Sequence, residues 1–223
     1  MHKQGCGLDH CFLCRNCIPE WKEVTALKKE TRLIKRGKPL FSEGEKVEGI
    51  FFIYSGVVKI HVPWADGREM IIRFARSGEI AGHRGLGGNA VYPISATALE
   101  DTLACFIPNE FLELSLKANP SLTYTLMHFY AMELQKAEKK MRELTHMDVK
   151  GRIAGALLEL AETFGVNEKG FLALVLTRQD IAAFAGTTYE TVFKYFTELT
   201  TAGVITTVGK DIKINQPEKL VLS

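Results

Sequence analysis

The chain has 223 residues, 46% of them hydrophobic and 24% charged, with a formal net charge of +2. This length fits two folded domains, and the ordinary composition excludes an intrinsically disordered chain. No run approaches about 18 apolar residues, and the first residues lack the apolar segment of a secretory signal, so we expect a cytoplasmic protein without a membrane anchor. Because the net charge is small, binding to nucleic acid would have to depend on where charges lie rather than on their sum.

Residues 1–24 form a cysteine-rich arm. Cys6, Cys11, Cys14 and Cys17 lie in it, and the chain has only one further cysteine, Cys105. In a reducing compartment such clusters are typical of metal sites or redox thiols. Four local thiolates satisfy tetrahedral zinc, and an iron–sulfur cluster takes thiolate ligands equally well. Unligated thiols on a mobile tail remain the plain alternative.

The Cys14-x-x-Cys17 pair also allows a thiol oxidoreductase. However, the arm lacks the strand and helix between which a redox C-x-x-C pair normally lies. The sequence also shows no glycine-rich phosphate loop, no paired catalytic carboxylates and no nucleophile elbow. We therefore expect that the chain is not an enzyme.

Residues 25–118 are predicted to form an antiparallel β-roll. Short runs of β-branched and aromatic residues, such as 50–54 and 70–74, alternate with glycines. Regular short strands with turn signals between them are typical of a rolled or closed antiparallel sheet. The sequence "ADGRE" around Asp66-Gly67 predicts a tight hairpin, because glycine accepts a positive φ without steric cost.

Residues 119–146 are predicted to form one long helix. Asn119-Pro120 is typical of a helix start, and no glycine or proline follows before Thr145. Apolar residues then recur with an average period of about 3.5, which is typical of a coiled-coil seam and predicts a homodimer. The alternative is that this face packs on its own domain. The predicted seam consists of Leu126, Tyr130, Leu134, Ala137, Met141 and Leu144.

Residues 147–223 are predicted to form a winged helix-turn-helix domain. An amphipathic helix comes first, and "TRQDIAAFAGTTYETVFKYFTELTTAGVI" then predicts two helices around Gly186. Capping boxes are predicted at Thr177–Asp180 and Thr187–Glu190. The sequence "VITTVGKDIKI" predicts a short hairpin around Gly209, which would form the wing.

A helix that starts at Thr188 would bury Val192, Tyr195, Phe196 and Leu199, and would direct other side chains outward. Of these, Glu190 can accept a hydrogen bond from cytosine, Lys194 can donate to guanine or a phosphate, and Phe193 can contact a thymine methyl group. The alternative for Glu190 is that it only completes its capping box. The candidate DNA-contacting residues are Thr177, Arg178, Thr188, Tyr189, Glu190, Phe193 and Lys194.

A roll, a long helix and a winged helix-turn-helix in this order resemble the family of the cAMP receptor protein and Fnr, which are bacterial transcription regulators. The most specific motif is "TRQDIAAFAGTTYETV", and the resemblance covers residues 20–223. It implies an α+β fold with a cyclic-nucleotide-binding-like roll, a homodimer on double-stranded DNA with an inverted repeat, and contact with RNA polymerase. It also implies base reading by Tyr189, Glu190 and Lys194. Tyr189 and Lys194 replace the family's usual arginines, so the operator stays open.

The cyclic-nucleotide branch of this family carries a Gly-Glu-x-Gly-Leu segment and a later Arg-Ser pair. This chain reads "GHRGL" at residues 82–86 and "YP" at residues 92–93. The carboxylate and the phosphate-binding guanidinium are both missing, and an anion needs fixed donors or positive charge to offset its desolvation. We therefore do not expect cAMP to bind.

The Fnr-like branch carries a cysteine-rich arm and one cysteine in the roll, and "ATALEDTLACFIP" places Cys105 at that position. This resemblance implies an iron–sulfur cluster held by Cys11, Cys14, Cys17 and Cys105, and a redox or oxygen signal. The arm's last gap is shorter than in Fnr, so zinc held by Cys6, Cys11, Cys14 and Cys17 remains the alternative. A regulator that senses a small molecule or acts constitutively, with a structural zinc or an unligated arm, is the competing function.

Overall fold

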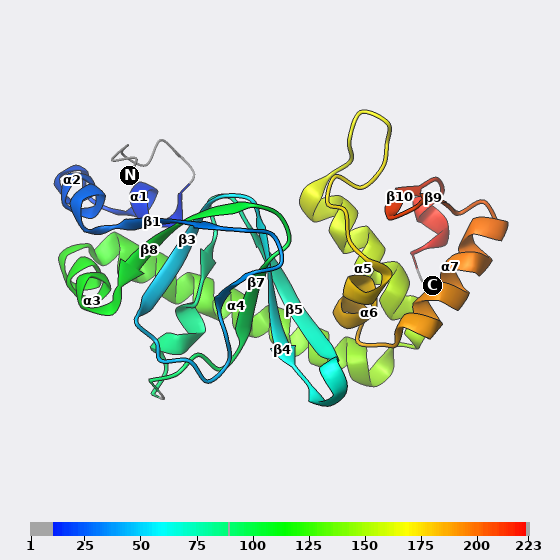
Figure 1. The fold of residues 1–223 in the computed structure, drawn as a ribbon, viewed down its shortest axis with the longest axis horizontal. Coiled ribbons are helices and arrows are strands. Elements are labelled where there is room, and N and C mark those ends of the chain that lie inside the picture. Colours follow the sequence, from blue (N-terminus) through cyan, green and yellow to red (C-terminus); the bar gives the residue numbers. More distant parts are fainter. Residues whose placement is uncertain (1–10, 89, 222–223) are drawn as a thin grey trace. The chain divides into compact units, whose positions relative to one another are not determined.

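The computed structural model of the chain describes residues 11–88 and 90–221. They form two compact units, the first ending at Gln135 and the second beginning at Lys136, so the boundary falls inside helix α4 (Pro120–His146). The order of elements confirms the predicted α+β class, with antiparallel strands first, then the long helix, then a helix-turn-helix with its hairpin (Figure 1).

The first unit contains two antiparallel sheets that form the roll. The first sheet has the strand order β1-β8-β3-β6, and the second has the order β2-β7-β4-β5. The strands of the first sheet are β1 (Glu30–Ile34), β8 (Thr102–Pro108), β3 (Gly49–Ser55) and β6 (Ile80–Ala81). The strands of the second sheet are β2 (Pro39–Phe41), β7 (Ser95–Ala98), β4 (Val57–Pro63) and β5 (Glu69–Arg76).

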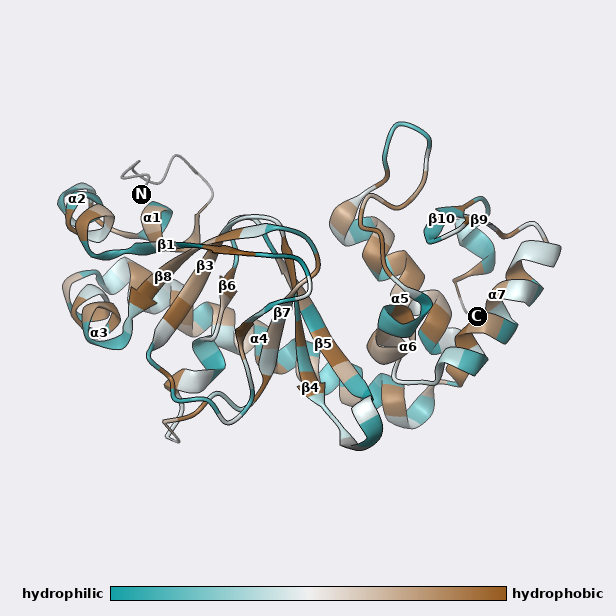
Figure 2. Cartoon of the chain, viewed as in Figure 1, coloured by the Kyte–Doolittle hydropathy of each residue, from teal (hydrophilic) through white to brown (hydrophobic). Residues whose placement is uncertain are grey.

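Strand β3 is apolar on both faces because both faces are covered. Phe51 and Ile53 pack into the interior of the roll, whereas Ile50 and Phe52 pack with the helices outside it. Strand β8 alternates in the same way, so Cys105 belongs to the cluster on the helical side. Figure 2 shows the resulting hydrophobic colour along both strands.

Helices cover the outer face of the first sheet. The arm folds into α1 (Phe12–Asn16) and α2 (Pro19–Lys28), which lie beside α3 (Asn109–Ala118) at one end of the roll (Figure 1). The predicted boundary at residue 25 thus falls inside α2, and the described part of the arm is helical rather than a tail. Two hydrogen bonds, one to α3 and one to its C-cap, hold the arm: the Trp21 Nε1–H donates to Ser115 Oγ at 2.9 Å, and the Ile18 N–H donates to Asn119 Oδ1 at 2.9 Å.

The hairpin between β4 and β5 contains the tight turn that "ADGRE" predicts. The 3-10 turn η1 (Ala65–Gly67) lies there, and Asp66 and Gly67 have φ values of 64° and 71°. Two successive residues with positive φ match the right-handed twist of the flanking strands. A second 3-10 turn, η2 (His83–Leu86), follows β6 and faces α4 through side-chain contacts described below.

Helix α4 has one face in the core of the first unit and one face exposed. Leu126, which the predicted seam includes, is only 7% exposed and packs in the core with the sheet and the arm, so it does not lie on the exposed face of α4. Met127, Leu134 and Met141, spaced seven residues apart, are 57%, 61% and 63% exposed. An apolar heptad spacing on an exposed face is typical of a dimer helix. Met127 therefore replaces Leu126 in the stripe.

Other predicted seam residues also touch their own chain. The Tyr130 hydroxyl donates to the carbonyl oxygen of His83, and Leu144 packs against Gly186. Ala137 is half-buried. The exposed stripe is therefore clearest at Met127, Leu134 and Met141.

The second unit is the helical domain with its wing. Its elements are α5 (Val149–Phe164), α6 (Arg178–Ala185), α7 (Tyr189–Thr201), β9 (Ile205–Val208), β10 (Asp211–Ile214) and the 3-10 turn η3 (Pro217–Lys219). Strands β9 and β10 pair antiparallel around Gly209, as predicted. No helix formed by the described residues combines the length and the apolar character that a bilayer span requires.

Candidate nucleic-acid interface and thiol cluster

Helix α6 begins at the predicted capping box. The Asp180 N–H donates to Thr177 Oγ1 at 3.0 Å, and the Thr177 N–H donates to the Asp180 carboxylate at 3.1 Å. Arg178 lies 4.5 Å from the ring centroid of Phe196 and donates to the carbonyl oxygen of Gly209 in the wing at 3.4 Å. Thr177 and Arg178 are candidate DNA-contacting residues. In the structure both side chains interact within the domain, Thr177 with Asp180 at the start of α6 and Arg178 with Phe196 and the wing.

The turn between α6 and α7 depends on Gly186. Its φ of 65° and ψ of 48° lie in the left-handed region, and a Cβ here would lie 2.6 Å from Cδ2 of Leu144. Glycine therefore satisfies both the backbone conformation and the close approach.

Helix α7 starts one residue later than its predicted capping box. Thr188, not Thr187, is the N-cap, and its hydroxyl accepts from the Thr191 N–H at 3.3 Å. The Thr187 N–H instead donates to the carbonyl oxygen of Ala182. The predicted box at Thr187–Glu190 is therefore wrong, and Glu190 does not complete it.

The two faces of α7 differ as predicted. Val192, Phe196 and Leu199 are buried, and Tyr195 is half-buried. The exposed candidates share the opposite face near the N-terminal end of the helix, where Tyr189 and Phe193 stack with ring centroids 6.2 Å apart. These exposed candidates are Thr188, Tyr189, Glu190, Phe193 and Lys194.

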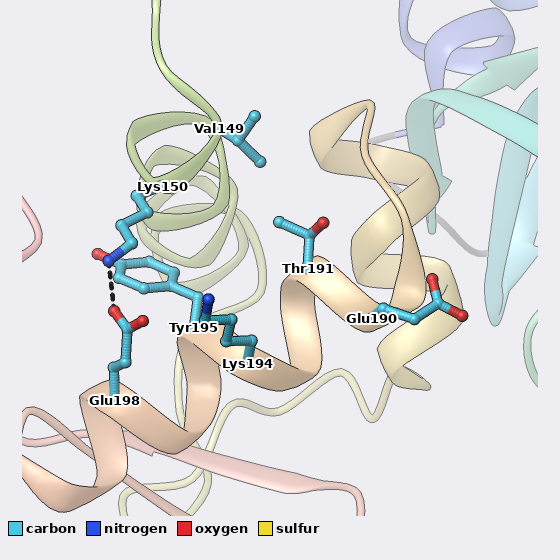
Figure 3. A pocket seen from close by; sticks show the side chains of 7 residues that line it. All are labelled: Val149, Lys150, Glu190, Thr191, Lys194, Tyr195 and Glu198. Atoms are coloured by element: carbon cyan, nitrogen blue, oxygen red, sulfur yellow. Dashed lines mark hydrogen bonds and ion pairs between the residues drawn. The ribbon is translucent and has the colours of Figure 1, made fainter.

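A pocket of about 420 Å³ lies between the start of α5 and this face of α7 (Figure 3). Lys150 of α5 reaches Glu198 of α7 across it, with Nζ and Oε2 2.5 Å apart. This hydrogen bond raises the pKa of Lys150, so the ammonium stays charged. The lining residues are Val149, Lys150, Glu190, Thr191, Lys194, Tyr195 and Glu198. Sequence reasoning did not identify Lys150, because only the fold brings the start of α5 beside α7.

The described cysteines gather in one hydrophobic cluster of the first unit. Cys11, Cys17 and Cys105 are buried in it, and Cys14 is half-buried and packs against it. Burial, together with repulsion from the neighbouring Cys11, raises the pKa of Cys17 to about 11. Cys6 lies outside the described residues.

These four cysteines have the chemistry of ligands for a soft metal ion or an iron–sulfur cluster. Their thiols are shielded from water and come from both the arm and β8. Within residues 11–88 and 90–221, however, no three His, Cys, Asp or Glu side chains are arranged to hold a metal ion. The cysteines therefore fit a metal centre in their chemistry and in their location within one cluster.

A buried ionic cluster joins α4 to the roll. Glu133 of α4 is 6% exposed, and its Oε2 lies 3.1 Å from Arg73 Nε and 3.3 Å from Arg84 Nη2. His83 beside it is 2% exposed, and burial, with added repulsion from Arg73 and Arg84, lowers its pKa to about 3. Arg84 thus binds a carboxylate of its own chain.

An aromatic contact connects this cluster to the arm. Phe129 of α4 lies edge to face with Phe12 at a centroid distance of 5.5 Å and with His83 at 4.8 Å. The Thr125 hydroxyl donates to Asn16 Oδ1 at 3.2 Å. The arm therefore contacts the same helix that carries Glu133.

Each of the two units matches a known domain family. The cyclic nucleotide-binding domain family matches residues 31–119, and the Crp-like helix-turn-helix domain family matches residues 151–222. A CRP-like cAMP-activated global transcriptional regulator of Mycobacterium tuberculosis is 30% identical over 201 residues, which cover 88% of this chain and 90% of that protein. The chain belongs to the Crp/Fnr family of transcription regulators.

Two further relatives of this Crp/Fnr regulator extend the comparison. An anaerobic regulatory protein of Aggregatibacter actinomycetemcomitans is 28% identical over 97% of this chain and 88% of that protein. The solved structure of FixK2 from Bradyrhizobium japonicum has a TM-score of 0.75 at 25% identity, covering 86% of this chain and 95% of that chain. The matched domains and relatives are DNA-binding transcription regulators, which confirms the prediction that this chain is not an enzyme.

Proposed function

We propose that this Crp/Fnr regulator acts as a homodimer that reads an inverted repeat through α7. The exposed apolar spacing of Met127, Leu134 and Met141 supports a dimer, because a monomer would leave that stripe in water. The exposed face with Glu190 and Lys194 supports base reading, since a carboxylate and an ammonium can address cytosine and guanine edges. Contact with RNA polymerase belongs to the same proposal and follows from the family alone.

We further propose that the thiol cluster is the signal receiver, through an iron–sulfur cluster held by Cys11, Cys14, Cys17 and Cys105. The single observation that carries this proposal is the gathering of these cysteines, from the arm and from β8, in one buried cluster. A relative named as an anaerobic regulatory protein supports an oxygen signal. When bound, such a cluster would supply iron–thiolate bonds whose loss reports oxidation.

The protein's own residues supply the route from the arm to the dimer helix. With the arm docked, Phe12 packs on Phe129 and Asn16 accepts from Thr125, so α4 has the arm along its side. Release of the arm would remove both contacts and expose part of the apolar cluster. The helix that carries the dimer stripe would thereby lose packing that fixes its position on the roll.

For cAMP we propose no role, although one relative is named as cAMP-activated. Arg84, the one guanidinium in residues 82–86, is paired with Glu133. The Tyr92 hydroxyl donates to the Gly49 carbonyl oxygen at 2.6 Å, and the following residue is Pro93, which has no N–H to donate.

The test compares Cys105→Ser with Cys6→Ser in full-length protein purified and reconstituted with iron and sulfide under anaerobic conditions. We expect the wild type and Cys6→Ser to show a broad visible absorption and matching iron and sulfide, and Cys105→Ser to lose both. If Cys105→Ser keeps a full metal complement and Cys6→Ser loses it, the arm holds zinc and the oxygen-sensing proposal is wrong. Loss of the spectrum on exposure of the wild type to air is the accompanying readout.

A further inference from the structure

Two half-buried cations bind consecutive carbonyl groups at the end of α6. Lys140 Nζ donates to the Phe184 carbonyl oxygen at 2.7 Å. Arg152 donates from Nε to the Ala185 carbonyl oxygen at 3.1 Å and from Nη2 to the Gly186 carbonyl oxygen at 3.2 Å. We call Lys140 and Arg152 the carbonyl clamp.

The clamp satisfies acceptors that the helix itself leaves open. The last carbonyls of a helix have no partner within it, and they carry the negative end of the helix dipole. Here the Gly186 and Thr187 N–H groups both donate to the carbonyl oxygen of Ala182, two residues before the clamped stretch. Phe184 and Ala185 are buried, so side-chain donors replace water.

The position of Lys140 carries a desolvation cost, because its ammonium is half-buried. Its ammonium lies 4.5 Å from the centre of the Phe184 ring. Burial lowers the pKa of Lys140, and Glu159 and Glu143 oppose that shift. An apolar residue would avoid this desolvation cost, so the ammonium serves the carbonyl.

Both cations lie on helices that precede α6 and α7 in the chain. Lys140 lies on α4, and Arg152 on α5 donates from Nη1 to the Met147 carbonyl oxygen at 2.9 Å, at the junction of α4 and α5. Leu144 of α4 fills the space against Gly186. The turn that starts α7 is therefore fixed to the last turns of α4 as well as to its own domain.

We propose that Lys140 and Arg152 are positioning residues for DNA recognition, which hold α7 in a fixed orientation to the end of α4. The inference rests on the proposed reading of an inverted repeat by a dimer. In a dimer whose shared element is α4, this orientation sets the separation of the two α7 helices. Half-sites for such a dimer lie about 34 Å apart, so the clamp sets which spacer the protein prefers.

The experiment uses the full-length protein and an inverted repeat selected by the wild type from random DNA. The variants are Lys140→Met, which removes the ammonium and keeps a long apolar stem, Lys140→Arg as the rescue, and Lys139→Met as the matched control. Lys139 is the neighbouring lysine, is exposed, and forms an ion pair with Glu143 at 3.7 Å on the surface of the same helix. Affinity is measured for the selected site, for versions with one base pair added to or removed from the spacer, and for a single half-site.

We expect Lys140→Met to lower affinity for the selected site about tenfold to a hundredfold, the effect of losing one hydrogen bond to a charged group. It should bind the half-site like the wild type and lose its preference among spacers. Lys139→Met should keep the wild-type preference, and Lys140→Arg should restore it. A purely structural role would instead weaken all these DNAs in proportion to the unfolded fraction, which thermal unfolding measures.

Two outcomes would overturn the clamp. One is a wild-type spacer preference in folded Lys140→Met, and the other is an equal loss on full site and half-site. If Lys140→Met does not fold, Arg152→Lys gives the same comparison. The lysine keeps the charge but cannot reach the carbonyl oxygens of Met147, Ala185 and Gly186 together. An unchanged spacer preference again refutes the proposal. If the wild type selects no symmetric site, the dimeric reader fails first and the clamp falls with it, a result visible before any variant is measured.

Discussion

Neutralising Glu133 tests whether the buried ionic cluster holds α4 on the roll. In Glu133→Gln the side chain keeps its size, but Arg73 loses the carboxylate at 3.1 Å while its own side chain is only 13% exposed. Breaking a buried pair by removing one partner costs about 3–5 kcal/mol. Glu79, which lies 3.5 Å from Arg73, keeps part of the compensation.

The second partner adds little to this figure. The side chain of Arg84 is 27% exposed, so water can replace much of what it loses, and a partly exposed pair contributes about 0–1 kcal/mol. We therefore expect Glu133→Gln to lower the free energy of unfolding by about 3 kcal/mol, near the bottom of the buried-pair range. For a chain of this size that corresponds to a melting temperature lower by about 6–12 °C.

Differential scanning calorimetry and urea unfolding measure both quantities. The matched control is Glu138→Gln, an exposed carboxylate on the same helix, which should change stability by less than about 0.5 kcal/mol. If Glu133→Gln costs less than about 1 kcal/mol, the cluster behaves like a surface ion pair, and the reasoning from burial is refuted.

Leu134→Glu should dissociate the dimer in sedimentation equilibrium with little loss of stability, whereas Leu126→Ala should leave the dimer intact and cost about 2–5 kcal/mol of core packing; the reverse pattern would assign the stripe wrongly. Glu190→Ala should reduce discrimination at one base pair of the selected site by about 1–3 kcal/mol in competition binding, and uniform weakening over all sequences would contradict base reading. Because the pKa of His83 is lowered in the fold from its ordinary 6.5 to about 3, the unfolded chain binds more protons between these values, so stability should fall as the pH drops through that window. His83→Gln should reduce the slope by up to about 1.4 kcal/mol per pH unit, and a slope equal to that of the wild type would exclude His83 as the cause. Added cAMP should leave the melting temperature unchanged, where a ligand at 100 times its dissociation constant would add about 2.7 kcal/mol, and a shift of several degrees would show that it binds.

The reading face of α7 could be predicted because it depends on local periodicity. Val192 and Phe196 repeat at helical spacing with polar residues between them, and a helix with one such stripe has only one face to bury. The sequence predicts the cap one residue early because Thr187 and Thr188 are chemically equivalent as caps. The backbone of Thr187 decides between them, since its N–H is bonded to Ala182.

The two faces of α4 could not be separated from the sequence. Leu126 and Met127 are adjacent and apolar, and a period of about 3.5 fits either one. Only the presence of the arm and the first sheet decides that Leu126 turns inward. Likewise, Glu133 reads as an ordinary helix-surface carboxylate, because its arginine partners are far away in the sequence and come from the roll.

The anchoring of α2 on α3 gives this protein an optical reporter of its own. The chain has two tryptophans, and Trp21 stacks on Phe111 with ring planes 3° apart at a centroid distance of 5.9 Å. Trp64, at the tip of the β4–β5 hairpin, is already 68% exposed and contributes a constant, water-like emission. Undocking of the arm would move the Trp21 indole into water and shift its emission to longer wavelength, while DNA binding by the tryptophan-free second unit would leave that signal unchanged. Unlabelled protein can therefore report on the state of its arm in the same cuvette in which its visible spectrum is recorded.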